Sequence, residues 1–345
     1  MFSGPLRVLE LSGPPHVMGR IHADRFSSSI RRYLEDRQST MADGTWFGDS
    51  SEPAVALELA ELTADHHQSY SASLFEELQS MAAAAGLTTG EAILVGGFTD
   101  IVDIVRSRVG SAISVDECTG ILNPELGFLA QTWDMNMSAG EYVLMMKIEP
   151  ESGPRALVQT TVGCLGQIGI NEAGIAVGIN NLTASGRLGV TWPFVVRAVL
   201  QQSSLDSAVS EVLRAHLAGG HNYFLMGPDG TAVNIEAMPT SVRVTKSSFA
   251  PMVHTNHCID PANAAIEANI PTEMAEDSHL RMSLANEYAH DLGSFFAEPR
   301  ISKRGVDPHG GATCGAAIMN TRELSMEALW GVPGYGEWEQ FSFDQ

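Results

Sequence analysis

The sequence predicts a mixed α+β protein built as a sandwich, in which helical layers cover β-sheets. Candidate helices fill roughly the first hundred residues, and short strands separated by turns follow after Cys118. The regular alternation of strand and helix that is typical of parallel nucleotide-binding folds does not occur, and no internal repeat is evident. Segregated helices and hairpin-linked strands are typical of α+β sandwiches.

Spacing and composition predict the N-terminal helices. Residues 18–37 place apolar side chains at roughly helical spacing among charged ones. Residues 51–87 are rich in Ala, Leu and Glu and end near Gly86, and a third helix is expected over 89–105. We therefore expect residues 1–117 to form a mostly helical segment.

The rest of the chain, residues 118–345, carries the predicted strands. Four turn-forming segments separate apolar runs and predict hairpins: Asn123–Glu125, Glu151–Pro154, Asn171–Gly174 and Pro228–Gly230. Helices interrupt this region, one beginning after Ser204 as N-cap and ending at Gly219, another over 275–291. No Pro/Gly/Ser-rich linker divides the chain, so the best internal boundary lies at Cys118.

Composition limits the function classes. The 345 residues carry 41 acidic and 20 basic side chains, a formal net charge of −21. Such a surface repels phosphate backbones and anionic lipids, so we expect neither nucleic acid nor a membrane as partner. The start of the chain lacks a secretory signal pattern, and the four cysteines form no CxxC pair. We therefore expect a cytoplasmic protein with reduced thiols.

The segment Ser-Val-Asp-Glu-Cys-Thr-Gly-Ile-Leu over 114–122 places a thiol behind two acids at the start of a strand. Three interpretations compete for Cys118. It could be a small core hydrophobe, as most unpaired cysteines are. It could pair with His254 or His257 in a papain-like Cys–His enzyme, although the nucleophile of such an enzyme begins a helix, and Thr-Gly-Ile-Leu favours a strand.

The third interpretation is an N-terminal nucleophile. If the chain cleaves itself before Cys118, that residue gains a free α-amine. An α-amine has an unperturbed pKa near ~8 and can serve as the base for the thiol of its own residue. This interpretation explains why the cysteine lies in the middle of the chain.

Six motifs in order resemble those of one family. They are Leu-Ser-Gly-Pro-Pro-His-Val-Met-Gly-Arg-Ile-His-Ala-Asp (11–24), Asp-Glu-Cys-Thr (116–119), Ala-Gln-Thr-Trp-Asp-Met-Asn (130–136), Asn-Glu-Ala-Gly-Ile-Ala-Val-Gly-Ile-Asn-Asn-Leu (171–182), Val-His-Thr-Asn-His-Cys (253–258) and Gly-Ala-Thr-Cys-Gly-Ala-Ala-Ile-Met (311–319). Over roughly residues 8–320 the chain resembles the acyl-coenzyme A:6-aminopenicillanic acid acyltransferase family of N-terminal nucleophile (Ntn) hydrolases. Each motif alone is weak, but six in the right order are fairly specific.

The resemblance implies a fold and a maturation step. The fold is an αββα sandwich, and the precursor cleaves itself between Glu117 and Cys118. Residues 1–117 would become an α chain and residues 118–345 a catalytic β chain, both within one αββα domain. No cofactor and no metal are implied.

The resemblance also implies roles for four residues. Cys118 is the expected nucleophile. Asp134 is expected to hold the new α-amine, because a carboxylate orients a nearby ammonium and raises its pKa. Asn256 and Asn180 are expected to donate hydrogen bonds to the oxyanion, since amides stabilise developing negative charge without titrating.

Other interpretations of these residues remain open. Asp134 could cap a turn at Met135–Gly140, and Asn180 could be a turn residue that ends a strand. The two histidines with Cys258 in the segment 254–258 suggest a metal site, but a fourth ligand is missing. The aromatic and Met side chains near the nucleophile strands would suit an apolar acyl group, and they are equally typical of sheet core.

Two departures from the family pattern limit the transfer. The family usually has glycine before the nucleophile, where crowding hinders cleavage, and this chain has Glu117. The family often has an arginine near its late strand, where this chain reads His309-Gly310-Gly311 and the nearest arginine is Arg304. In related bile-salt hydrolases an arginine precedes the aspartate by three residues, and Gln131 stands there.

The predicted function is an autoprocessed amidohydrolase that cleaves a linear non-peptide amide through a thioester on Cys118. An acyltransferase is the alternative, because an amine can intercept the same acyl-enzyme. A different class is an unprocessed scaffold or binding protein that keeps the fold, a reading supported by Glu117. The expected partners are a small-molecule amide or acyl donor and the α and β chains themselves, with a larger homo-oligomer left open.

Overall fold

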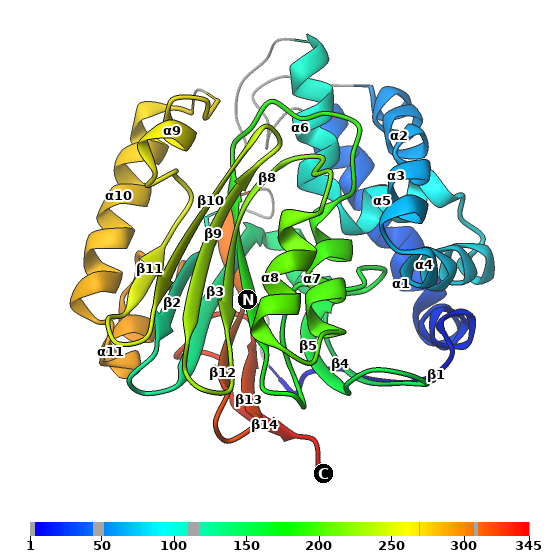
Figure 1. Cartoon of the computed structure of the whole chain (residues 1–345). Coiled ribbons are helices and arrows are strands. Elements are labelled where there is room, and N and C mark those ends of the chain that lie inside the picture. Colours follow the sequence, from blue (N-terminus) through cyan, green and yellow to red (C-terminus); the bar gives the residue numbers. More distant parts are fainter. Residues whose placement is uncertain (1–3, 44–51, 110–116, 269, 307–309, 345) are drawn as a thin grey trace.

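The computed structural model describes residues 4–43, 52–109, 117–268, 270–306 and 310–344. In this part of the chain two β-sheets lie face to face, and helices cover the outer face of each sheet (Figure 1). The arrangement confirms the predicted αββα sandwich.

The larger sheet has eight strands in the order β1-β4-β5-β6-β7-β8-β9-β10. The strand β1 pairs parallel with β4, and every later neighbour pairs antiparallel. The strands are β1 (Val8–Gly13), β4 (Val143–Pro150), β5 (Ala156–Thr161), β6 (Ile168–Asn171), β7 (Ala176–Leu182), β8 (Gly220–Met226), β9 (Ala232–Met238) and β10 (Ser241–Ser247).

The smaller sheet has six strands in the order β11-β2-β3-β12-β13-β14, all antiparallel. They are β2 (Thr119–Asn123), β3 (Phe128–Asn136), β11 (Met252–His254), β12 (Gly311–Asn320), β13 (Ser325–Trp330) and β14 (Trp338–Ser342). All four predicted turns connect neighbouring strands of one sheet, so the hairpin predictions are confirmed.

Helices form the two outer layers. On the smaller sheet α10 packs over β2 and β11, and α11 follows it. On the larger sheet α7 and α8 pack over β6–β9, and the N-terminal helices lie beyond them (Figure 1). The helices are α1 (Pro15–Asp43), α2 (Pro53–Leu62), α3 (Ala64–Tyr70), α4 (Ala72–Ala85), α5 (Thr89–Gly96), α6 (Phe98–Val109), α7 (Trp192–Leu200), α8 (Leu205–Leu213), α9 (Pro261–Ala264), α10 (Thr272–Glu287) and α11 (Leu292–Ala297).

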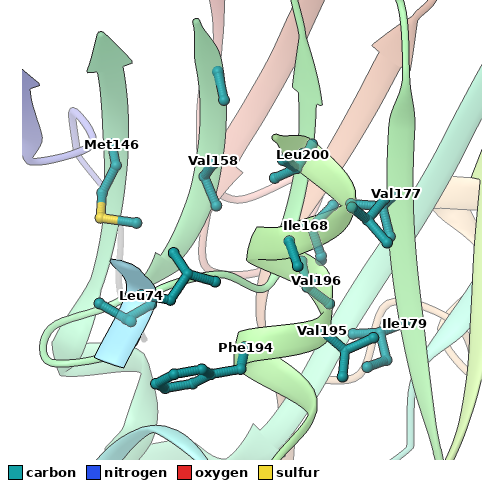
Figure 2. Packing of buried hydrophobic residues seen from close by; sticks show 14 of the residues in the cluster. Leu74, Met146, Val158, Ile168, Val177, Ile179, Phe194, Val195, Val196 and Leu200 are labelled. Carbon is teal, nitrogen blue, oxygen red and sulfur yellow. The ribbon is translucent and has the colours of Figure 1, made fainter. Parts of the chain in front are cut away.

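The layer between the helices and the larger sheet is apolar. In Figure 2 the side chains of α7 face those of β6 and β7, and Leu74 of α4 lies on the side of Met146 and Val158. Val177 and Ile179 of β7 point into this layer, and both are buried. Because side chains alternate along a strand, Gly178 and Asn180 must point the other way, toward the smaller sheet.

The two sheets approach each other closely where glycines face them. A side chain at Gly120 of β2 would come within 2.4 Å of Phe224, and one at Gly178 within 2.4 Å of Gln131. Gln131 also joins the sheets by hydrogen bonds, because its side chain donates to Ile179 O and accepts from Ile179 N. Gln131 therefore bridges the two sheets at the position where related bile-salt hydrolases are expected to carry an arginine.

The N-terminal segment differs from the prediction in its boundaries. The expected helix over 51–87 is three helices, because Ser71 has an extended backbone and caps α4 through Leu74 N. The expected helix over 89–105 breaks at Gly97, where any side chain would meet Thr191. The segment also contributes β1, a strand that the sequence analysis missed.

The helix after Ser204 is confirmed at its start and shorter than expected at its end. The Ser204 hydroxyl accepts a hydrogen bond from Ser207 N, as an N-cap does. The helix ends at Leu213 rather than at Gly219. Gly219 lies instead against α6, where a side chain would come within 2.2 Å of Asp100 Oδ1.

Two residues of the first family motif have structural roles. A side chain at Gly19 would come within 2.1 Å of Glu77 O, so glycine permits the close crossing of α1 and α4. His22 is fully buried, and its Nε2 accepts a hydrogen bond from Gly163 N at 3.0 Å. Burial lowers the pKa of His22 to about 4, which keeps the accepting nitrogen unprotonated.

Among the helices of the described residues, none combines the length and the apolar character that crossing a bilayer requires.

Candidate active site

Cys118 lies immediately before β2 and is 3% exposed. The strand β2 is central in the smaller sheet, between β11 and β3. Alternation along the strand places Cys118 on the same face as Gly120, which packs against Phe224 of the larger sheet. The thiol therefore belongs to the layer between the sheets, at the start of a strand, as the sequence predicts.

Asn256 follows β11 and lies beside Cys118. The register of β11 and β2 opposes His254 to Gly120, so continuing it brings position 256 opposite position 118. The Asn256 Nδ2 group donates to Asn181 O at 3.0 Å, and its Oδ1 accepts from Arg281 at 3.2 Å. These two contacts set the orientation of the amide and leave its second N–H for another acceptor.

Asp134 of β3 is buried, with 1% of its surface exposed. Its Oδ1 accepts a hydrogen bond from the Thr313 hydroxyl at 2.6 Å. Its Oδ2 has no hydrogen-bond partner among the described residues. Burial raises the pKa of Asp134 to about 7, although the nearby charges of Lys303 and Arg281 oppose the shift.

This geometry contradicts the turn-cap interpretation of Asp134. The residue lies within β3, and in the turn that follows it is Asn136 whose side chain donates to the Ser138 hydroxyl. Continuing the register of β2 and β3 by two residues brings Glu117 opposite Asp134. The carboxyl group therefore lies near the expected cleavage point.

Asn180 is inside β7 rather than at its end, so the turn interpretation is wrong. It is fully buried and pairs in register with Asn222 of β8. Neither amide has a hydrogen-bond partner for its oxygen or its nitrogen within the described part of the chain. Both side chains face the smaller sheet. The residue after Asn180, Asn181, is the one whose carbonyl accepts a hydrogen bond from Asn256.

The sequence analysis missed Asn222. The segment Asn-Tyr-Phe-Leu-Met-Gly at 222–227 predicts a strand, and the structure places Asn222 inside β8, Gly220–Met226. An asparagine in a fully buried strand is itself unusual. Its importance becomes visible only when register places it beside Asn180.

Arg281 of α10, which no sequence pattern indicated, connects the backbone of Cys118 to its surroundings. The guanidinium is 1% exposed. It donates to Cys118 O at 2.9 Å, to the Thr119 hydroxyl at 2.9 Å and to Asn256 Oδ1 at 3.2 Å. Its Nε also contacts Asp277 at 2.8 Å, which balances the buried charge.

Glu117 is held by charge. Its carboxylate forms an ion pair with Lys303, whose Nζ also lies 2.9 Å from Asp277. Burial acts to raise the pKa of Asp277, but its bonds to Lys303 and Arg281 outweigh this and keep that pKa below the ordinary value.

Arg304, the arginine nearest in sequence to the late strand, stacks with its guanidinium 4.1 Å from the centre of the Tyr335 ring. His309 falls outside the described residues.

A narrow pocket with a cavity volume of about 10 Å³ opens beside this cluster. It is lined by Glu117, Asn181, Thr183, Asn256, Ile270, Met274, Ser278 and Arg281. The pocket thus lies between Glu117, the residue before Cys118, and Asn256, the predicted oxyanion donor.

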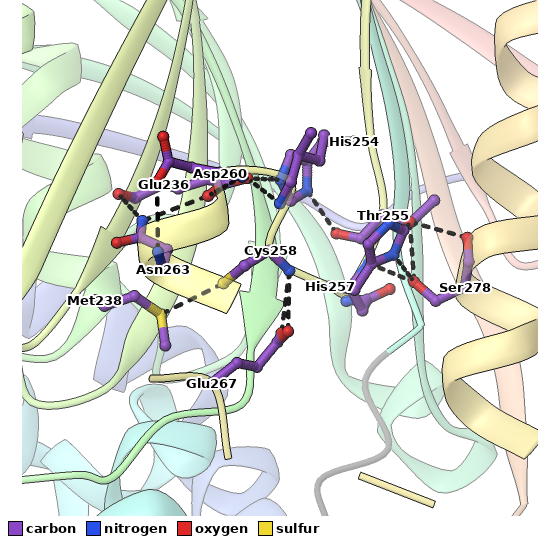
Figure 3. A network of polar contacts seen from close by, with 12 residues as sticks. Glu236, Met238, His254, Thr255, His257, Cys258, Asp260, Asn263, Glu267 and Ser278 are labelled. Carbon is purple, nitrogen blue, oxygen red and sulfur yellow. Dashed lines mark hydrogen bonds and ion pairs between the residues drawn. The ribbon is translucent and has the colours of Figure 1, made fainter. Parts of the chain in front are cut away.

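The histidines of the segment 254–258 are engaged in structural contacts (Figure 3). His254 is fully buried, with Nε2 at 3.0 Å from Glu236 and Nδ1 at 2.8 Å from Thr255 O, so both ring nitrogens are occupied. The Nδ1 of His257 lies 2.8 Å from the Ser278 hydroxyl. Burial lowers the pKa of His257 to about 4.

The third member of that segment, Cys258, is also accounted for. Its thiol contacts Met238 Sδ at 3.9 Å, and burial raises its pKa far above the ordinary value. In the described ranges no group of three or more His, Cys, Asp or Glu side chains is arranged to hold a metal ion. The contacts in Figure 3 explain the segment without one.

The profile of the acyl-coenzyme A:6-aminopenicillanic acid acyl-transferase family matches residues 122–298, just over half of the chain. The chain belongs to this family. The matched region begins four residues after Cys118 and includes Asp134, Asn180, Asn256 and Arg281. Membership, together with the αββα architecture, identifies the protein as an acyltransferase or amidohydrolase of the Ntn-hydrolase fold.

A curated relative of the family is the acyl-coenzyme A:6-aminopenicillanic-acid-acyltransferase 40 kDa form of Emericella nidulans. It is 24% identical over 255 residues, which cover 72% of this chain and 68% of that protein.

Two solved structures show weaker similarity, each with a TM-score of 0.45 and 12% identity over 66% of this chain. They are a variant of conjugated bile acid hydrolase from Clostridium perfringens, covered to 93%, and penicillin V acylase from Agrobacterium tumefaciens, covered to 86%. The fold assignment rests on the strand order and layers of the chain itself.

Proposed function

We propose that the protein is an autoprocessed amidohydrolase that cleaves a linear non-peptide amide through a thioester on Cys118. One observation carries the proposal. Cys118 begins a central strand, and the buried Asp134 on the neighbouring strand has one oxygen without a hydrogen-bond partner among the described residues. A new α-ammonium at Cys118 would supply the donor and the charge that this oxygen lacks.

The processing step follows from the same atoms. The Cys118 sulfur attacks the Glu117 carbonyl carbon and forms a thioester as the C–N bond between the two residues breaks. The released amine of Cys118 takes the proton that the thiol gives up. Water then hydrolyses the thioester, which leaves a carboxylate on Glu117 and a free thiol on Cys118. The two products would be an α chain of 1–117 and a β chain of 118–345.

Substrate hydrolysis then repeats this chemistry on an external amide. The α-amine takes the thiol proton, and the thiolate forms a tetrahedral intermediate with the substrate carbonyl. The second N–H of Asn256 is oriented to donate to the oxyanion, because Asn181 and Arg281 hold the rest of the amide. Asn180 supplies another buried amide whose nitrogen is unbonded in the described structure. Losing one such donor typically costs about 10²–10³ in rate.

Acyl transfer is the second candidate, favoured by the named activity of the family and of the Emericella nidulans relative. Both reactions share the thioester and differ only in whether water or an amine attacks it. Product analysis with and without an acceptor amine distinguishes them. A dominant amide product in the presence of the acceptor would make the protein an acyltransferase.

Intact mass under denaturing conditions tests the proposal. Wild type, Cys118→Ala and Cys258→Ala are compared, since Cys258 is another buried cysteine with no proposed role in the chemistry. We expect chains of 117 and 228 residues in wild type and Cys258→Ala, and one chain of 345 residues in Cys118→Ala. One whole chain in all three would contradict autoprocessing and support the scaffold interpretation.

A further inference from the structure

The side chain of Glu117 occupies an ionic site that is built into the fold. Its carboxylate pairs with Lys303, whose side chain is 16% exposed. Asp277 lies 2.9 Å from the same ammonium and also bonds Arg281, which binds Cys118 O. The residue before the cleavage point is therefore held through its charge by Lys303, and ion pairs through Asp277 and Arg281 connect Lys303 to Cys118 O.

Lys303 is held by its backbone as well as by its charge. Its N–H donates to the Thr313 hydroxyl at 2.8 Å, and its carbonyl accepts from Thr313 N at 3.0 Å. The same Thr313 hydroxyl bonds Asp134. The ammonium that binds Glu117 is therefore positioned relative to the catalytic strands, unlike a lysine on a solvated surface.

In self-cleavage Glu117 is the acyl group. Its carbonyl carbon is the one that sulfur attacks, so its side chain occupies the acyl side of the site. A substrate must place its own carbonyl against the same sulfur and the same donors, and its acyl chain then follows the path of Glu117. We propose that the mature enzyme prefers acyl groups ending in a carboxylate three carbons from the carbonyl, as in a glutaryl amide, and that Lys303 binds this carboxylate.

Charge in the cluster agrees with this assignment. Before cleavage the two mostly buried cations, Lys303 and Arg281, face three carboxyl groups, those of Glu117, Asp277 and Asp134. The more exposed Arg300 also pairs with Asp277, at the edge of the cluster. For a substrate to reach the sulfur, Glu117, now the C-terminus of the α chain, must leave the site after cleavage. With an α-ammonium on Cys118, three mostly buried cations then face the two carboxyl groups of Asp277 and Asp134. The mature site then has room and charge for one anion. This inference rests on the proposed function, because only cleavage frees the site.

The test uses processed protein and two p-nitroanilides, glutaryl and pentanoyl, which share chain length and differ in the terminal carboxylate. We expect kcat/KM for the glutaryl compound to be roughly 10- to 100-fold higher, as charge-assisted hydrogen bonds allow. Lys303→Met should bring this ratio toward one. Arg300→Met is the matched control, because Arg300 contacts Asp277 but is 55% exposed, and the ratio should stay as in wild type.

Each other outcome is decisive. Equal rates or a preference for the pentanoyl compound would overturn the acidic acyl site and leave the amidase standing. If processed protein turns over neither compound, the proposed function fails. The carboxylate site is then tested separately, by whether glutarate raises the melting temperature of the protein more than pentanoate does. If glutarate does not stabilise the wild type, or stabilises Lys303→Met equally, the proposed carboxylate site is overturned. If Lys303→Met does not process, the proposal is decided by the wild-type ratio of kcat/KM for the glutaryl and pentanoyl compounds. A wild type that never processes overturns both proposals.

Discussion

Two buried polar clusters flank the strand pair β2–β11, and they differ in how their hydrogen bonds are satisfied. The groups that contact the Glu236 carboxylate are hydrogen-bonded (Figure 3). The amide of Asn222, which is in register with Glu236 on the neighbouring strand, is not. The carboxylate accepts from His254, Ile259 N, Asp260 N and the Asn263 amide, and of that amide only Oδ1 is unpaired. By contrast, Asp134 Oδ2 near Glu117 and both amides of the Asn180–Asn222 pair, the row in register with Glu236, have no partner among the described residues.

The difference indicates what each cluster is for. An unpaired buried polar atom costs about 1–3 kcal/mol, so a fold retains several at one place only when another property requires them. The Glu236 cluster stabilises the segment after β11 that carries Asn256. In the proposed mechanism, the unpaired atoms near Cys118 are available for two groups that the unprocessed chain does not supply, an α-ammonium and an oxyanion.

The largest expected effect is loss of the satisfied cluster. Glu236→Ala leaves the His254 ring and two backbone N–H groups without their acceptor. We expect the free energy of unfolding to fall by about 3–5 kcal/mol, measured by denaturant titration. Processing, followed by intact mass in the folded fraction, should still occur. A stable Glu236→Ala protein that fails to process would place Glu236 in the chemistry and end the distinction between the clusters.

A smaller effect of opposite sign is expected for the unsatisfied cluster. Asn180→Leu removes a buried amide without hydrogen-bond partners in the described structure and keeps a similar volume. We expect the unfolding free energy to rise by about 1 kcal/mol while amide hydrolysis slows about 10²–10³-fold. The measurements are denaturant titration in a Cys118→Ala background and kcat with the preferred anilide. A destabilised variant with unchanged kcat would show that Asn180 is structural.

The smallest effect concerns pH. In the uncleaved Cys118→Ala chain the pKa of Asp134 is about 7 against an ordinary 3.8, so the folded state binds the extra proton between these values. Stability should therefore be greatest at low pH for this group and fall as pH rises. We expect a loss of about 1–3 kcal/mol between pH 5 and pH 7. Thermal melts across this pH range compare Cys118→Ala with Cys118→Ala/Asp134→Asn, in which the pH-dependent loss of stability from Asp134 should vanish. Parallel curves of stability against pH for the two proteins would contradict the raised pKa of Asp134.

Much of the fold was predictable because it depends on local chemistry. The turns at 123–125, 151–154, 171–174 and 228–230 contain Asn, Pro, Asp or Gly, whose backbone preferences act within a few residues. Alternation and apolar runs likewise indicated most strands. The helix breaks at Ser71 and Gly97 were not predicted, since the closeness of Gly97 to Thr191 arises only when distant segments pack.

The sequence by itself determined the class of sandwich, the position of a thiol at a strand start, and the ordered motifs that indicated Cys118, Asp134, Asn180 and Asn256. It could not reveal Arg281, Asn222 or Lys303. The motifs are short stretches of chain, whereas these three side chains come from elements distant in sequence. Arg281 of a helix contacts Cys118, Asn222 of a neighbouring strand lies beside Asn180, and Lys303 of a loop pairs with Glu117. Only tertiary structure decided which charges surround Glu117, because register and packing alone bring those segments together.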